Sequence, residues 1–184
     1  KSSAASDVYK RQVVFASNLP YYITTPILFK LFEAKEPIDA ITVMMQKEVG
    51  QRFLAQASAK EYNALSVIWQ YKCDCKKVMD VSRHVFWPSP RVDSVVLQFT
   101  FHHKYHYANE AAFFWLVKSC FVQRRKTIYN NLQNALKDKE LALQMLEKAG
   151  IAPSKRAQQC QLEDFMRLFE ANESSLIAAY QNQS

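Results

Sequence analysis

Hydrophobic and polar positions in the first half of the chain follow two different periods. Nearly unbroken apolar runs at 12–16 and 39–46 predict short strands of the kind that is buried in a parallel sheet. Between them, residues 24–34 carry apolar side chains at helical spacing, after a threonine suited to a helix cap and a proline suited to a first turn. The pattern predicts strand, helix and strand, which is the repeating unit of an α/β fold.

The next part of the chain predicts two more helices and a late pair of strands. Helical spacing recurs at 47–56 and 63–72. Two β-rich segments follow, at 73–81 and 91–101, on either side of a loop that is dense in proline and aromatic residues. Because no crossover helix separates these strands, we expect them to form an antiparallel pair at the edge of the sheet.

After a polar break, strand signals disappear and three amphipathic segments follow, at 111–136, 139–150 and 161–172. We therefore expect the α/β class: the carboxyl-terminal half of a doubly wound Rossmann-like sheet, followed by a small all-α domain. The expected units are a disordered or artefactual leader at 1–12, a partial α/β domain at 13–103 and a helical domain at 108–184.

Composition narrows the class of partner only slightly. The net charge of +7 and the pI of about 9.2 suggest a polyanion, although a merely soluble basic protein remains an equal alternative. The sequence has no apolar run long enough to span a membrane and no visible secretion signal, so we expect a cytoplasmic location and free thiols at the four cysteines.

The segment "SNLPYYITTP" (17–26) follows the first strand, and open α/β sheets bind their ligands at the carboxyl ends of strands. The side-chain carbonyl of Asn18 and the backbone carbonyl of Leu19 can accept hydrogen bonds. Pro20 restricts the course of the loop, and Tyr21 offers a ring on which a base can stack. Two acceptors beside a ring suit an exocyclic amine such as N6 of adenine, although an ordinary strand-to-helix turn is an equal alternative.

This segment resembles the catalytic segment of the ribosomal RNA small-subunit adenine N6,N6-dimethyltransferase family. Further matches follow in the family's order, and the resemblance extends from about residue 13 to about residue 168. The matching segments are "MMQKEVGQRF", "KEYNALSV", "FWPSPRVDS", "FVQRRKTIYNNL" and "GIAPSKRAQQCQLEDFMRL".

The resemblance implies transfer of methyl groups from S-adenosylmethionine to adenines of small-subunit (16S) ribosomal RNA. It implies that Asn18, Leu19, Pro20 and Tyr21 are catalytic, that Asn18 also meets the cofactor, and that Tyr21 stacks on a flipped adenine. Phe86, in the proline-rich loop, would close the other side of the base. Because the sulfonium is already a good leaving group, we expect no metal and no covalent enzyme intermediate.

The densest basic cluster is "QRRKTIYNN" (123–131). We expect Arg124, Arg125 and Lys126, fanned over a helix, to contact RNA together with Arg91, although a solvated helix face is the alternative. The implied partner is small-subunit ribosomal RNA, bound by a monomer. Weaker candidates for RNA contact are Arg52, Lys60, Arg83, Lys155 and Arg156.

One departure from the family leaves other functions open. The sequence has two glycines, Gly50 and Gly150, and neither follows a strand, so we expect an amino-terminal truncation that removes most of the cofactor-binding half. The 184 residues alone are then expected not to bind S-adenosylmethionine. The alternatives are a non-catalytic RNA-binding or ribosome-assembly module and a large-subunit (macrolide-resistance) adenine methyltransferase.

Histidine and cysteine clusters carry little weight as sites. His102, His103 and His106 are close in sequence, but a polar linker predicts solvated side chains rather than metal ligands. Cys73 and Cys75 share one face of a predicted strand, which fits burial at least as well as ligation.

Overall fold

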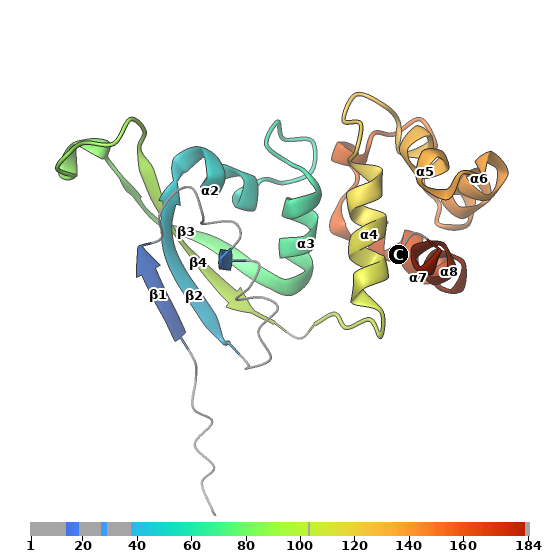
Figure 1. Cartoon of the computed structure of the whole chain (residues 1–184), viewed down its shortest axis with the longest axis horizontal. Coiled ribbons are helices and arrows are strands. Elements are labelled where there is room, and N and C mark those ends of the chain that lie inside the picture. Colours follow the sequence, from blue (N-terminus) through green and yellow to red (C-terminus); the bar gives the residue numbers. More distant parts are fainter. Residues whose placement is uncertain (1–13, 19–26, 29–37, 103, 183–184) are drawn as a thin grey trace, which may run out of the picture.

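The computed structural model describes residues 14–18, 27–28, 38–102 and 104–182. Figure 1 shows a sheet with helices against one face and a further group of helices beside it. The strands are β1 (Val14–Asn18), β2 (Ala40–Gln46), β3 (Cys73–Val81) and β4 (Ser94–Phe101). The α-helices are α2 (Lys47–Leu54), α3 (Ala64–Lys72), α4 (Glu110–Cys120), α5 (Ile128–Leu136), α6 (Lys139–Lys148), α7 (Leu162–Ala171) and α8 (Glu173–Gln181). Two short 3-10 helices are η1 (Arg83–Val85) and η2 (Ala157–Gln159).

The strands of the described residues form one sheet in the order β1-β2-β4-β3. β1 pairs with β2 in parallel, whereas β4 is antiparallel to both β2 and β3. The predicted late antiparallel pair is therefore confirmed. The expectation of parallel pairing for β2 holds on the side of β1 alone, because the chain turns back after β3 and β4 enters the sheet antiparallel to β2 on its other side.

Burial along β2 alternates, as expected for a strand with one face against a core. Ile41, Val43 and Met45 are fully buried, while Thr42 and Met44 on the other face are half-buried. Of the two adjacent methionines, only Met45 therefore lies fully in the core.

Helices α2 and α3 cover the buried face of the sheet, and an aromatic cluster fills the space between them. The ring of Phe53 lies 5.0 Å from Trp69 and 5.3 Å from Phe99, centroid to centroid, in edge-to-face geometry. Gly50 allows α2 to approach β4 this closely, because a Cβ at this position would lie 2.3 Å from Cγ1 of Val95. A side chain here would displace the helix from the sheet.

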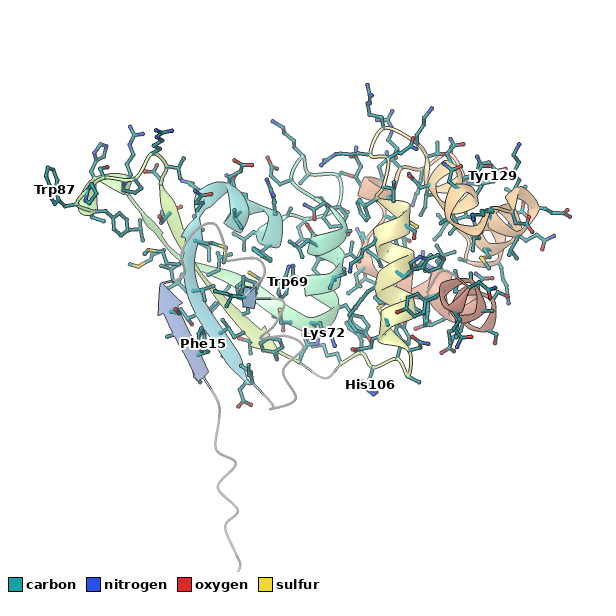
Figure 2. All side chains as sticks on the ribbon, in the orientation of Figure 1. Phe15, Trp69, Lys72, Trp87, His106 and Tyr129 are labelled. Atoms are coloured by element: carbon teal, nitrogen blue, oxygen red, sulfur yellow. The ribbon has the colours of Figure 1, made fainter. Side chains whose placement is uncertain are left out.

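Helix α3 belongs to two cores at once. The side chain of Asn63 caps its first turn by accepting from the N–H of Leu65 at 2.8 Å. Trp69 faces the sheet, whereas Tyr71 packs among the aromatic side chains of the helical part (Figure 2). The domain boundary between residues 103 and 108 stays a prediction, but the packing shows that α3 contributes side chains to both hydrophobic cores.

The helical part is held to the preceding residues by polar as well as apolar contacts. The hydroxyl of Tyr62 donates to the backbone carbonyl of Cys160 at 3.0 Å, across 98 positions of sequence. Lys72 at the end of α3 forms an ion pair with Glu110 at the start of α4. No helix within the described ranges is both long and apolar enough to cross a lipid bilayer.

Candidate RNA and base-binding site

The first part of the candidate site is the carboxyl end of β1. Asn18 is the last residue of this strand and pairs with Met44 of β2. The side chain of Asn18 and the residues Leu19, Pro20 and Tyr21 lie outside the described part of the chain. What the structure establishes is therefore the position of the Asn18 backbone, at the end of a parallel strand pair where α/β sheets bind ligands.

The proline-rich loop at 82–93 lies at the same end of the sheet. The row of paired residues that contains Asn18 and Met44 continues to Val96 of β4 and Met79 of β3. Because β3 ends and β4 begins just beyond that row, the loop between them extends from the edge that Asn18 faces (Figure 1). Asn18 and this loop, separated by more than sixty positions in sequence, are thus brought to one end of the sheet.

A set of hydrogen bonds fixes the shape of this loop. The N–H of Arg83 donates to Oδ1 of Asp93 at 3.0 Å, and its guanidinium donates to the carbonyl of Arg91 at 3.2 Å. The hydroxyl of Ser89 donates to the carbonyl of Arg83 at 2.9 Å. The loop therefore has a defined conformation even though most of its residues are exposed.

Two aromatic residues stand next to each other in this loop. Phe86 is half-buried and has an extended backbone, with φ −106° and ψ 149°. Trp87 is 98% exposed and lies at the far end of the loop, away from the sheet (Figure 2). The sequence prediction included Phe86 but missed Trp87. The signal that could have found it is the aromatic residue type itself, in a proline-rich loop beside Phe86.

The second part of the candidate site is the basic segment Gln123–Lys126. The prediction that Arg124, Arg125 and Lys126 lie on a helix is wrong, because α4 ends at Cys120 and α5 begins at Ile128. The basic residues are in the loop between them and line a hollow of about 520 Å³ together with Gln123.

A buried asparagine is the physical reason for this loop. The side chain of Asn131, which is 3% exposed, accepts from the N–H of Gln123 at 2.9 Å and donates to the carbonyl of Gln123 at 3.1 Å. Thr127 caps the new helix by accepting from the N–H of Asn130 at 3.2 Å. Both contacts favour a break in the helix over its continuation.

Within this loop, the three cationic side chains differ in their environment. The guanidinium of Arg124 donates to Oε1 of Gln158 at 2.9 Å, to the carbonyl of Ala59 at 3.4 Å and to the carbonyl of Lys60. The side chains of Arg125 and Lys126 are exposed and make no hydrogen bond or ion pair with the described residues. Arg124 thus joins segments of the protein, while the other two cations are available to a partner.

Of the weaker candidates, several lie close to the basic loop. The N–H of Ile128 donates to the carbonyl of Lys155 at 2.7 Å. Arg156 directly precedes η2, which contains Gln158. Arg52 lies on α2, earlier in the sequence, and its guanidinium pairs with Glu48 at 2.8 Å. The structure therefore gathers Lys60, Lys155 and Arg156 around the loop but not Arg52.

Titratable groups near these segments are shifted mainly by burial. Burial raises the pKa of Tyr62, and it raises the pKa of Cys160 to about 11. Burial also raises the pKa of Cys75 to about 12 and that of Cys73 above its usual range, so neither thiol has the depressed pKa of a nucleophile. Among the described residues, no group of three or more histidine, cysteine or acidic side chains is arranged to hold a metal ion, and His103 lies outside them.

Comparison with known proteins identifies the group of proteins that this chain resembles. A family model described as ribosomal RNA adenine dimethylase matches residues 2–173. "Ribosomal RNA small subunit methyltransferase A" of Staphylococcus aureus strains JH9 and Newman is 47% identical over 165 residues. This match covers 86% of the chain but 56% of the relative, so the chain spans little more than half the length of these curated proteins.

Solved structures show the same fold. A dimethyladenosine transferase from Plasmodium falciparum superposes with a TM-score of 0.77 at 26% identity, covering 95% of this chain and 71% of that one. The 23S rRNA methyltransferase ErmE superposes with a TM-score of 0.65 at 22% identity, covering 87% and 65%, and is similar in fold alone. These similarities confirm the predicted fold class, a Rossmann-like methyltransferase sheet followed by helices. The chain belongs to the ribosomal RNA adenine dimethylase family.

Proposed function

We propose that this chain forms the adenine-binding and RNA-binding part of a ribosomal RNA adenine N6,N6-dimethyltransferase, with S-adenosylmethionine as methyl donor and small-subunit (16S) ribosomal RNA as substrate. One observation carries the proposal beyond family membership. The strand end that precedes Leu19–Tyr21 and the loop that contains Phe86 lie at the same end of the sheet. This arrangement supports a single site built from both motifs.

In this site, the target adenine is flipped out of its stack and held between Tyr21 and Phe86. The side-chain carbonyl of Asn18 and the backbone carbonyl of Leu19 accept hydrogen bonds from the N6 amine. Holding the amine by its hydrogens leaves the nitrogen lone pair free and aimed in one direction. Positioning of this kind can supply most of the catalysis when the leaving group is already good.

S-adenosylmethionine, when bound, supplies an electrophilic methyl group to the amine. Of the residues that would meet it, the structure describes only the backbone of Asn18. The described residues alone therefore do not form a site for this cofactor. The part played by this chain is to bind the RNA and to orient the acceptor nitrogen.

The path of the RNA follows the cationic segments. The loop at 82–93, the connector at 55–63 and the loop between α4 and α5 lie along one edge of the molecule in Figure 1. Lysine and arginine along such an edge neutralise phosphates and release counterions. The residues proposed to contact phosphate along this path are Lys60, Arg83, Arg91, Arg125, Lys126, Lys155 and Arg156. A ribosomal substrate implies a cytoplasmic location, and a single chain is sufficient for this path.

The test is methyl transfer from labelled S-adenosylmethionine to undermethylated small ribosomal subunits. The chain is joined to those residues of the Staphylococcus aureus relative that it does not span, and the product nucleosides are identified by mass spectrometry. We expect N6,N6-dimethyladenosine in the small subunit and none in large subunits treated in parallel. Binding to small subunits without any transfer would instead support a ribosome-assembly module, and methylation of large subunits would support the resistance-type enzyme.

A further inference from the structure

Trp87 is an exposed aromatic side chain to which the proposed site gives no role. It is 98% exposed, although a tryptophan that has no partner usually buries most of its large surface. We propose that Trp87 stacks on a nucleotide next to the target adenine and so replaces the neighbour that this nucleotide loses when the adenine flips out. This inference rests on the proposed function, because it requires a flipped base at Phe86.

The backbone separates the two neighbouring rings. Phe86 has extended dihedral angles, and successive side chains of an extended segment point to opposite sides. Phe86 is half-buried against the protein while Trp87 points outward. One ring is therefore available to a base inside the site, and the other to a base that stays in the RNA strand outside it.

The exposure of Trp87 belongs to a fixed loop conformation. The backbone on both sides is tied by the bonds from Arg83 to Asp93 and to Arg91 and by the bond from Ser89 to Arg83. A loop whose backbone is ordered before binding loses less conformational entropy when a base stacks on its side chain. The loop thus has the properties of a preformed stacking platform.

Charge around Trp87 favours nucleic acid over a protein partner. Arg83 and Arg91 are both exposed, and no acidic side chain among the described residues pairs with either guanidinium. A flat ring in a loop that also carries two cations is the combination that binds single-stranded RNA, in which the bases stack and the phosphates are neutralised. Stacking does not depend strongly on base identity, so the expected contribution is to affinity and to holding the flipped state.

Equilibrium binding of the 184-residue chain to undermethylated small ribosomal subunits tests this inference. We expect Trp87→Leu to weaken binding by about 5-fold to 150-fold, the loss expected for one base stack, and Trp87→Phe to retain most of the affinity. The matched control is Val85→Ala, which removes an apolar side chain that is 70% exposed from the same loop and should leave binding unchanged. Equal melting temperatures for all variants exclude a folding defect.

Ultraviolet crosslinking of the wild-type complex then identifies what Trp87 contacts. We expect Trp87 to be joined to a ribonucleotide, whereas a join to a ribosomal protein would overturn the inference. If the wild-type chain binds and Trp87→Leu binds equally well, the inference fails while the proposed function stands. If the wild-type chain does not bind small subunits at all, the proposed function fails and the inference falls with it.

Discussion

The guanidinium of Arg124 donates from Nε to Oε1 of Gln158 at 2.9 Å, and its Nη2 atom reaches the carbonyls of Ala59 and Lys60. One side chain thus connects the loop between α4 and α5 with the connector before α3 and with η2. Although the basic residues of this loop are expected to contact RNA, Arg124 makes hydrogen bonds that hold three segments of the protein together.

Replacement of Arg124 should therefore lower stability. We expect Arg124→Ala to reduce the free energy of unfolding by about 1 kcal/mol, because three hydrogen bonds to exposed or partly exposed acceptors are lost. Urea denaturation measures this change. Arg125→Ala is the matched control and should lie within about 0.5 kcal/mol of wild type, since its exposed side chain makes no hydrogen bond or ion pair with the described residues. An equal loss in both variants would refute the structural role.

The neighbouring cations should show the opposite behaviour. Each of Arg125→Ala and Lys126→Ala removes one phosphate contact, so the slope of log affinity for ribosomal RNA against log salt should become shallower by about 0.7–0.9. Filter binding over a range of salt concentrations gives these slopes. Lys139→Ala, an exposed lysine at the start of α6, serves as control and should leave the slope unchanged. A slope that is the same in all four proteins would exclude this loop from the RNA interface.

Tyr62→Phe should destabilise the contact between the connector and the helical part. The Tyr62 hydroxyl is the donor to the carbonyl of Cys160, and Tyr62 is 1% exposed, so its removal leaves a buried acceptor unsatisfied. We expect a loss of about 1–3 kcal/mol in the free energy of unfolding. Tyr129→Phe is the control, because that hydroxyl makes no hydrogen bond within the described residues. A loss under about 0.5 kcal/mol for Tyr62→Phe would contradict the assignment.

Stability should fall at alkaline pH because of buried tyrosines. Burial raises the pKa of Tyr71 to about 12, and burial likewise raises the pKa of Tyr62 and Tyr107. An unfolded tyrosine loses its proton near pH 10 while the folded one keeps it, so the unfolded state gains stability as pH rises above 10. The contribution of Tyr71 is fully present below pH 10 and is lost as pH rises toward 12.

Chemical denaturation at a series of pH values from 9 to 11.5 tests this pH dependence. Tyr71→Phe should reduce the slope of stability against pH, whatever its effect on stability at neutral pH. Tyr129→Phe, at a half-buried position, again serves as the control. A slope unaffected by Tyr71→Phe would mean that this hydroxyl titrates as in the unfolded chain.

Local patterns were sufficient to predict much of the fold. The apolar run at 39–46 and the helical spacing at 63–72 depend on neighbours in sequence, and β2 and α3 lie where these patterns indicate. The antiparallel β3–β4 pair followed from the absence of a crossover helix between the two strands. The helix α8 was missed because its residues give a weak pattern, in which Leu176 is the one buried side chain.

The candidate site was harder to predict where long-range contacts decide it. The sequence "QRRKT" has helical character, and the break arises from the side chain of Asn131, eight positions away from Gln123. The internal role of Arg124 depends on Gln158, which is 34 positions away. Trp87 looks like a core residue by composition, and only the fold shows that it is exposed.

In the proposed function, the segment after β1 and the loop before β4 form one adenine site. The most direct test of this proposal is labelled methyl transfer to undermethylated small subunits by the chain joined to the remaining residues of the relative. We expect Asn18→Ala to abolish transfer and Phe86→Leu to reduce it at least tenfold, while both variants still bind subunits as wild type does. Asn134→Ala, an exposed asparagine on α5, should transfer normally. Wild-type rates for Asn18→Ala and Phe86→Leu in an active protein would contradict the account.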